Sequence, residues 1–272
     1  MSNEEIKKYR TLFVSDLHLG LGASQADLFL DFFKTVQAEK IYLVGDIIDF
    51  WRIRRRPQWH QSHNDVVQKL LRSVRKGTKM VYIPGNHDEM LRAYCGMQIG
   101  GIDLKRRDIH ETADGRKFLI IHGDEFDIVV RHAKWLAFLG DGAYNLALWL
   151  NTHFNWVRRK AGLEYWSLSA YLKQRVKQAV KFIGEFEHAL STEAEKRKVD
   201  GVICGHIHQM AMKQIGDVLY INTGDWVESC TAVGETMDGT FELIQWKNGE
   251  AIIESEVSIK TRPKAEFMVD AA

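Results

Sequence analysis

The sequence predicts an α/β fold with a helical insertion. Short apolar runs rich in β-branched residues alternate with stretches in which apolar residues recur every three or four positions, a pattern typical of alternating strands and helices. From about residue 127 to 198 the strand pattern disappears and only the helical one remains. Because alternating strands and helices form largely parallel sheets covered by helices, we expect a single domain over residues 1–272, with the insertion at about 128–198.

Strands and helices follow each other through the first half of the chain. The expected elements are a strand near residues 10–14, a helix over 24–37, a strand over 41–44, a helix near 64–76, a strand ending at Pro84, and a hairpin that turns at Asp114-Gly115 before a strand over 118–121. In the first helix, Leu28, Phe32 and Val36 recur at helical spacing. The strands are short and apolar, so we expect them to be buried.

The insertion is expected to be helical in its second half. Apolar residues keep steps of three and four there, at Leu168, Leu172, Val176, Ala179, Ile183, Phe186 and Leu190. Strands then resume over residues 201–204. Further hairpins are expected at Gly216-Asp217, Asp238-Gly239 and Asn248-Gly249. The chain contains no internal repeat, so these segments complete one interrupted domain.

The overall composition limits the possible functions. The formal net charge is +1, which gives no general attraction to nucleic acid or to an anionic membrane. The three cysteines are odd in number and far apart, which favours reduced thiols in a cytoplasmic protein. The amino terminus has no apolar core of the kind found in secretory signals. The apolar stretch 135–150 is interrupted by Gly140, Asp141 and Gly142 and is too short to span a membrane.

Five short clusters of Asp, Asn and His follow predicted strands and indicate the chemistry. They are Asp16-Leu17-His18, Gly45-Asp46-Ile47-Ile48-Asp49, Gly85-Asn86-His87-Asp88, His122-Gly123-Asp124 and Gly205-His206-Ile207-His208. Carboxylate, amide and imidazole groups are ligands of hard to borderline divalent metals. Because the carboxyl ends of neighbouring strands meet at one edge of a sheet, the clusters predict a metal site there. The alternative interpretation, unrelated turn and capping residues, explains each cluster singly but not five together.

Two metals that share a carboxylate would suit displacement at phosphorus, because they lower the pKa of a bridging water and neutralise phosphoryl charge. Asp46 is the expected bridging ligand. The other ligands form two sets, with Asp16, His18 and His208 for one metal and Asn86, His122 and His206 for the other. His87 follows a ligand directly, so we expect it to act as general acid or phosphate donor, with Asp88 orienting its ring.

The order of the five clusters resembles the calcineurin-like metallophosphoesterase superfamily over residues 11–225. The resemblance implies a four-layer α/β-β/α sandwich, two divalent metals, often manganese, and hydrolysis of a phosphoester or phosphoanhydride. Within the superfamily, Ser15-Asp16-Leu17-His18-Leu19, Asp49-Phe50-Trp51 and the helical insertion are most similar to the UDP-2,3-diacylglucosamine pyrophosphatase group of lipid A synthesis. Members of that group often carry Arg at the position of His87, which here matches the wider superfamily.

Two segments are candidates for substrate binding. Arg52, Arg54 and Arg55 follow the bridging-carboxylate cluster and would grip a diphosphate, because guanidinium binds phosphate in bidentate fashion. The alternative is a solvated basic loop. Large apolar residues are concentrated in the insertion, among them Trp135, Phe138 and Trp149. They would form a lid for acyl chains or a surface that enters a bilayer interface, although an ordinary helical core is the favoured interpretation.

The leading functional hypothesis is that the protein is a cytoplasmic enzyme, peripheral on the inner face of the membrane. It would hydrolyse UDP-2,3-diacylglucosamine to UMP and a lipid monophosphate through a hydroxide bridging two manganese ions. The main alternative is a phosphodiesterase or phosphatase with a soluble substrate, such as a cyclic nucleotide or phosphoprotein. A nucleic-acid substrate is disfavoured because there is no long basic surface, and a binding scaffold is disfavoured because every expected ligand is present. The sequence leaves the oligomeric state open.

Overall fold

A computed structural model describes residues 6–129 and 168–257 of the chain. The chain divides into two compact units, the first formed by residues 1–124 and 193–272 and the second by residues 125–192. Both β-sheets lie in the first unit. The predicted organisation, a single domain with a lid-like insertion at about 128–198, stays a prediction.

The first sheet has eight strands, in the order β13-β12-β11-β1-β2-β3-β5-β4. Their bounds are β1 (Lys7–Val14), β2 (Val36–Val44), β3 (Lys79–Ile83), β4 (Gln98–Ile99), β5 (Ile102–Leu104), β11 (Thr231–Glu235), β12 (Phe241–Lys247) and β13 (Glu250–Val257). The central strands β1, β2, β3 and β5 are parallel, and the strands on both sides of them pair antiparallel. The largely parallel arrangement predicted from the alternating strands and helices is observed in the central strands, and the hairpins predicted at Asp238-Gly239 and Asn248-Gly249 join β11, β12 and β13 at one edge.

The second sheet has five strands in the order β6-β7-β8-β10-β9. Their bounds are β6 (Asp108–Glu111), β7 (Lys117–Ile120), β8 (Gly201–Cys204), β9 (Ala211–Ile215) and β10 (Val218–Asn222). β7, β8 and β10 are parallel, and an antiparallel hairpin closes each edge. Gly115 and Gly216 have positive φ angles in those two hairpin turns, as the sequence predicts.

Four helices and two short 3-10 helices are described. They are α1 (Ala26–Thr35), α2 (Phe50–Arg55), α3 (Gln61–Arg75), α5 (Leu168–Lys196), η1 (Glu89–Tyr94) and η2 (Asp124–Val129). The predicted first helix ends two residues early, because Val36 is extended, with φ −123° and ψ 150°, and pairs with Lys7 of β1. The segment that follows Asp49, for which a solvated basic loop was one of two interpretations, is the helix α2.

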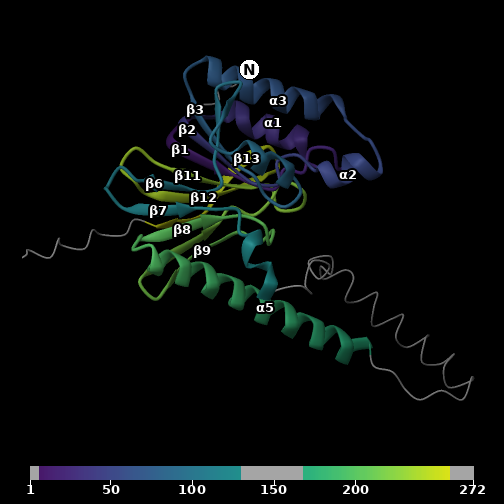
Figure 1. Cartoon of the computed structure of the whole chain (residues 1–272), viewed down its shortest axis with the longest axis vertical. Coiled ribbons are helices and arrows are strands. Elements are labelled where there is room, and N and C mark those ends of the chain that lie inside the picture. The colour runs from purple at the N-terminus through teal and green to yellow at the C-terminus, as the bar shows by residue number, and fades with distance from the viewer. Residues whose placement is uncertain (1–5, 130–167, 258–272) are drawn as a thin grey trace, which may run out of the picture. The chain divides into compact units, whose positions relative to one another are not determined.

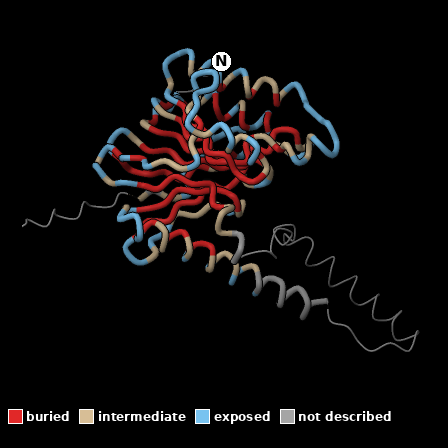
Figure 2. The backbone as a smooth tube through the Cα atoms, in the orientation of Figure 1, coloured by how far each residue is buried: buried red, intermediate tan, exposed pale blue. Residues whose placement is uncertain are grey.

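Two apolar layers hold the first unit together. Figure 1 shows α1 and α3 on one side of the strands β1, β2 and β3, with β8 and β9 of the second sheet on the other. On one face of the first sheet, Leu12 belongs to a buried cluster with Phe29 of α1 and Val66 of α3. On the other face, Phe13 packs in a cluster with Phe118 of the second sheet. Successive residues of a strand point to opposite faces, so β1 contributes to both layers. Figure 2 shows that buried residues are concentrated in the two sheets. The predicted α/β class, with two sheets and flanking helices, is confirmed.

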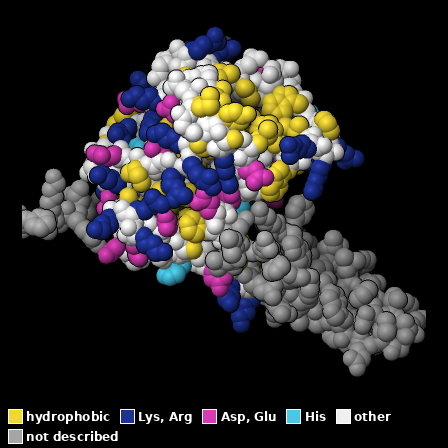
Figure 3. All heavy atoms as spheres, in the orientation of Figure 1, with side chains coloured by type: hydrophobic (Ala, Val, Ile, Leu, Met, Phe, Trp, Pro, Cys, Tyr) yellow, Lys and Arg dark blue, Asp and Glu magenta, His cyan; other side chains and the backbone are white. Residues whose placement is uncertain are grey.

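The described surface is mixed in character. Figure 3 shows basic and acidic side chains interspersed over part of it, with hydrophobic side chains gathered above them. Exposed apolar side chains include Met90, Tyr94, Met97 and Ile99. Within residues 6–129 and 168–257, no helix combines the length and apolar character needed to cross a membrane.

Candidate metal centre

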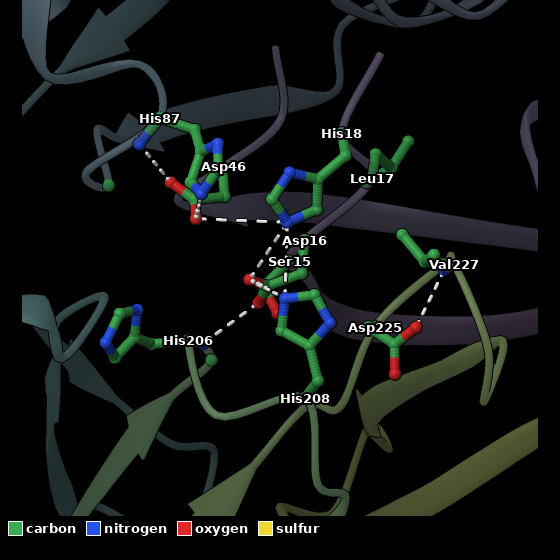
Figure 4. A network of polar contacts seen from close by, with 12 residues as sticks. Ser15, Asp16, Leu17, His18, Asp46, His87, His206, His208, Asp225 and Val227 are labelled. Carbon is green, nitrogen blue, oxygen red and sulfur yellow. Dashed lines mark hydrogen bonds and ion pairs between the residues drawn. The ribbon is translucent and has the colours of Figure 1, made fainter. Parts of the chain in front are cut away.

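The five polar clusters lie where five strands end. β1, β2 and β3 are neighbours in the first sheet, β7 and β8 are neighbours in the second, and one cluster follows each strand. These neighbours are parallel, so their carboxyl ends reach a common edge. Figure 4 shows side chains from four of the clusters, including Asp16, Asp46, His87 and His206, converging at that edge. The predicted convergence of the clusters is therefore observed.

A first group consists of Asp16, His18 and His208, each of which offers one atom within 4.8 Å of the other two. His208 Nε2 is 3.2 Å from Asp16 Oδ1, and His18 Nε2 is 3.7 Å from the same oxygen. The two Nε2 atoms are 3.2 Å apart. Two imidazole nitrogens and one carboxylate oxygen around a common point form a donor set that suits a divalent cation.

A second group consists of Asp46, His122 and His206, again with one atom from each within 4.8 Å of the others. His122 Nε2 is 3.4 Å from Asp46 Oδ2. The other ring nitrogen of His122, Nδ1, lies 2.8 Å from the carbonyl oxygen of Val44, to which it can donate. That hydrogen bond fixes the ring and leaves Nε2 as the nitrogen that faces the group.

Asp46, a member of the second group, also approaches the first. Its Oδ2 atom is 3.4 Å from His122 Nε2 in one group and 3.9 Å from His18 Nε2 in the other. Its Oδ1 atom accepts a hydrogen bond from the backbone N–H of His87 at 2.8 Å. The side chain of Asn86, the predicted amide ligand, is buried beside this loop, and its Oδ1 atom has no hydrogen-bond partner.

The backbone of these loops is left-handed at five of the residues that the sequence predicts as ligands. They are Asp16, His18, Asp46, His206 and His208, with φ between 48° and 74°. Residues with a Cβ rarely adopt this conformation, and each costs of order 1–3 kcal/mol. Three more such residues occur in the described chain, so the strain is concentrated at this edge. Such outliers persist where the surrounding structure fixes them and are frequent at functional sites.

Two glycines allow the loops to approach closely. A Cβ at Gly45, where φ is 83°, would overlap the His122 ring, and a Cβ at Gly85 would overlap both Asp46 and His122. Any side chain at either position would therefore push the second group apart. This explains why a glycine precedes both Asp46 and Asn86 in the sequence.

The charges of the two groups are strongly coupled. Burial alone would lower the pKa of His122, but the Asp46 carboxylate outweighs it and raises this pKa to about 10. Burial likewise opposes the charge on His18, whose pKa is raised to about 10 by hydrogen bonds to Asp16 and Asp49. Burial would raise the pKa of Asp46, yet the neighbouring histidines hold it well below its usual range. The raised pKa values of His18 and His122 favour their protonated forms, and a divalent cation would displace those protons.

The donor set also fits a metal because several buried polar atoms lack hydrogen bonds. Asp16 Oδ1, Asn86 Oδ1 and His122 Nε2 are all buried without a hydrogen-bond partner. An unsatisfied buried polar atom costs about 1–3 kcal/mol, and more when it is charged. Three such atoms from three of the clusters, with carboxylate, amide and imidazole chemistry, match the preferences of a divalent cation.

The structure places Asp49, rather than Asp88, beside the His87 ring. His87 Nδ1 is 3.0 Å from Asp49 Oδ2, and the same oxygen is 3.4 Å from His18 Nδ1. Asp88 instead accepts hydrogen bonds from the N–H groups of Gly85 and Ile47 and from the Tyr82 hydroxyl, at 2.5 to 2.9 Å. The sequence analysis assigned no role to Asp49. The available signal was the second Asp of Gly45-Asp46-Ile47-Ile48-Asp49.

The predicted substrate-binding residues differ in where they lie and in how exposed they are. Arg52 lies in α2, whose amino end is capped by Asp49, and its Nε atom is buried without a hydrogen-bond partner. Arg54 and Arg55 are exposed on the same helix. Beside them, the Trp51 ring lies 4.4 Å from the His87 ring and is 42% exposed, so an aromatic surface borders the site. The remaining predicted residues, Trp135, Phe138 and Trp149, lie outside the described residues.

Comparison with known proteins places this geometry in a family. A protein named UDP-2,3-diacylglucosamine hydrolase from Aliivibrio fischeri is 35% identical over 118 residues, which are 42% of this chain and 47% of that protein. The protein of the same name from Haemophilus influenzae is 29% identical over 81% of this chain and 92% of its own. This chain spans about half the length of the first three curated relatives that it matches.

Among solved structures, the phosphoesterase Yfce from E. coli is 15% identical, with 92% of this chain and 99% of that one covered and a TM-score of 0.45. The family model described as calcineurin-like phosphoesterase matches residues 9–210. That range contains all five clusters, from Asp16 to His208. The chain therefore belongs to the calcineurin-like phosphoesterase family.

Proposed function

We propose that this protein is a metal-dependent phosphohydrolase that uses two manganese ions to cleave the diphosphate of UDP-2,3-diacylglucosamine into UMP and a lipid monophosphate. The observation that carries the reaction class is the position of Asp46, which belongs to the second group of ligands and lies within 4 Å of His18 in the first. A carboxylate so placed suits a pair of ions rather than a single one. Family membership implies divalent metal ions.

The ligand roles follow from the geometry of the two groups. Asp16, His18 and His208 would hold one ion, Asn86, His122 and His206 would hold the other, and Asp46 would be shared. Bound divalent ions would supply an activated water and would neutralise charge on the phosphoryl oxygens. The protein itself supplies the rigid loops that keep these ligands together and the glycines that let them approach.

His87 is the proposed proton donor or phosphate contact. Its side chain is 22% exposed, whereas Asp46, 3.9 Å from its Nε2 atom, is buried. Asp49 holds the opposite nitrogen at 3.0 Å, so the proton available for transfer would lie at Nε2. Arg52, whose Nε atom is buried without a partner, is proposed as a further contact for the diphosphate. Arg54 and Arg55 are exposed and would act only at the edge of the site.

The substrate is proposed from the named relatives. Proteins from Aliivibrio fischeri and Haemophilus influenzae carry the name UDP-2,3-diacylglucosamine hydrolase. The exposed Trp51 ring beside His87 offers an apolar contact of the kind an acylated substrate needs. We extend the proposal to a cytoplasmic location with peripheral contact to the inner face of the membrane, because a diacylated substrate resides in a bilayer.

A second candidate is a phosphodiesterase or phosphatase with a soluble substrate. The observation that favours it is His87 itself, which matches the wider superfamily rather than the Arg often found in the lipid A group. The two candidates share the metal chemistry and differ in whether acyl chains contribute to binding. A substrate series with and without acyl chains therefore separates them.

The deciding experiment is manganese-dependent hydrolysis of UDP-2,3-diacylglucosamine in detergent, followed by phosphorus NMR. The wild type, Asp46→Ala and His87→Ala are compared, with a generic aryl phosphodiester as control substrate. We expect UMP and lipid monophosphate from the wild type and a loss of at least about 100-fold in both variants. Cleavage of the aryl ester alone would retain the metal chemistry and rule out the lipid substrate. Absence of metal-dependent cleavage of either compound would overturn the proposed reaction class.

A further inference from the structure

A second polar cleft lies at the opposite end of the same strands. It has a volume of about 750 Å³ and is lined by the first residues of β1, β2 and β3 together with part of β6 and the turn after α3. Lys8, in this cleft, and Asp16, in the metal groups, are eight residues apart along an extended strand, which is roughly 25 Å. The cleft is therefore separate from the candidate metal centre.

Basic side chains outnumber acidic ones in the lining. Lys8, Arg10, Lys40, Lys76 and Lys79 contribute five positive charges, and Glu39 and Glu111 contribute two negative ones. Lys8, Lys76 and Lys79 are exposed. No ion pair is recorded for these three lysines within the described part of the chain. Their charges are thus available to a ligand.

The two more buried cations are held in place by the fold. Arg10 directs Nη1 to Glu235 at 2.8 Å and to the carbonyl oxygen of Glu111 at 2.8 Å. Among the residues that the structure describes, none accepts a hydrogen bond from its Nε or Nη2 atom, so these atoms can bind another partner. Lys40 is half-buried, with Nζ 2.5 Å from the Tyr42 hydroxyl and 3.9 Å from Asp108.

Lys40 is also crowded by like charges. Burial lowers its pKa first, and Lys105, Arg10 and Lys79 lower it further, although Asp108 opposes them. An anion in the cleft would relieve this repulsion between neighbouring cations. A fixed guanidinium beside several mobile ammonium groups is the combination that binds phosphate oxygens.

The side chains that line the cleft limit the class of ligand it can bind. Tyr9, the one large aromatic side chain in the lining, is 1% exposed, so it offers no stacking surface for a nucleobase. The only exposed large apolar side chains in the lining are Ile109 and Met237. Recognition would therefore rest on charge and hydrogen bonds rather than on an apolar body.

We propose that this cleft is a binding site for the phosphate chain of a small polyphosphate-bearing anion, distinct from the hydrolytic centre. The ligand is either an inorganic polyphosphate or the phosphates of a nucleotide, since both present the same chain of charged oxygens. This site does not depend on the proposed hydrolytic function, because none of its residues belongs to the metal groups.

The test is isothermal titration of the intact full-length chain with tripolyphosphate and, separately, with a nucleoside triphosphate. EDTA is present throughout, so that no metal holds phosphate at the other end of the strands. Lys8→Gln/Lys79→Gln removes two exposed cations of the cleft. Lys34→Gln/Lys247→Gln removes the same charge elsewhere and serves as the matched control. Lys8→Arg/Lys79→Arg keeps the charge and tests rescue, and thermal unfolding checks that every variant is folded.

We expect one saturable site in the wild type, weakened at least about tenfold in Lys8→Gln/Lys79→Gln and less than about twofold in the control. The arginine variant should retain binding. Similar affinities for the two probes would indicate recognition of the phosphate chain alone, and a tighter nucleotide would indicate a nucleoside phosphate as the source; both support the site. Absence of saturable binding, or equal weakening in the cleft and control variants, would overturn it.

Discussion

The two ends of β1, β2 and β3 differ in whether their buried polar atoms have hydrogen-bond partners. At the carboxyl end, Asp16, Asn86 and His122 bury polar atoms that have no hydrogen-bond partner. At the amino end, the fully buried Glu235 accepts hydrogen bonds from Arg10, His110 and the backbone N–H of Ala113, at 2.7 to 2.8 Å. A charge that the fold satisfies contributes to stability, whereas atoms left unsatisfied need a ligand.

The largest expected effect belongs to the satisfied end. Glu235→Gln removes a buried charge that pairs with Arg10 and His110, and removing one partner of a buried pair costs about 3–5 kcal/mol. We expect the free energy of unfolding in urea to fall by that amount while metal-dependent turnover stays within about twofold. An unchanged free energy of unfolding would show that the hydrogen bonds of Glu235 do not stabilise this end of the sheet.

The same variant has a defined pH dependence. Burial would raise the pKa of Glu235, but the hydrogen bond and charge of His110, together with hydrogen bonds from Thr11 and the Ala113 N–H, outweigh burial and lower this pKa below its ordinary 4.5. A depressed folded-state pKa adds stability above the unfolded-state value, and that stability is lost as the pH falls through the folded-state value. The stability gap between wild type and Glu235→Gln should therefore be full above about pH 4.5 and shrink in more acidic urea titrations.

At the unsatisfied end, metal should raise stability. Addition of manganese at a hundred times its dissociation constant contributes about 2.7 kcal/mol, or about 5–10 °C in Tm for a chain of this size. Because the pKa values of His18 and His122 are raised to about 10, uptake should release protons and weaken as the pH falls. Differential scanning calorimetry with and without EDTA measures the shift. Asp46→Ala should show little of it, and an equal shift in that variant would place the metal elsewhere.

Two glycines with positive φ, one at each end, sharpen the comparison. Gly45 has φ of 83° and faces the His122 ring, whereas Gly77 has φ of 101° and nothing within 4 Å. Alanine at either position pays the same kind of backbone cost. Only Gly45→Ala should displace a ligand, which we expect to lower kcat/KM about 100-fold. Equal activity of Gly45→Ala and Gly77→Ala would show that the close approach to His122 is dispensable.

The smallest effect separates two neighbouring carboxylates. Asp49→Asn should lower kcat about tenfold and alter the pH–rate profile, with little change in KM, because Asp49 orients the ring of His87. Asp88→Asn should instead destabilise the fold by about 1–3 kcal/mol, since Asp88 accepts from Tyr82 and the backbone of the loop. The reverse pattern would restore the orienting role that the sequence suggested for Asp88.

The sequence predicted most of the strands because apolar runs between glycines have few alternatives to burial. The start of β2 at Val36 was missed, since helical spacing continues through that residue and only its pairing with Lys7 makes it extended. The six-residue helix α2 was also missed. Helices that short are not stable alone. The local signal for this one was Asp49, whose side chain accepts a hydrogen bond from the N–H of Arg52 and caps the helix.

The same limit applies to the candidate site. Spacing located all five clusters, because each directly follows a strand and strand ends converge. It did not reveal which carboxylate faces His87, since Asp49 and Asp88 are both close to ligands in sequence. Spacing does not determine which hydrogen-bond partners a loop carboxylate takes. Asp49 caps α2, and Asp88 accepts hydrogen bonds from Tyr82 and from the N–H groups of Ile47 and Gly85.

The left-handed backbone at Asp16, Asp46 and His206 also bears on how this protein would respond to selection for heat resistance. Glycine would relieve the backbone cost at each of these positions, and asparagine tolerates it better than most residues. A screen that rewards thermal stability alone would thus enrich substitutions that erase the donor atoms. Engineering a more thermostable variant requires these positions to be kept unchanged and stabilising substitutions to be made elsewhere. At these residues, the substitution that stabilises the backbone also removes the donor atom.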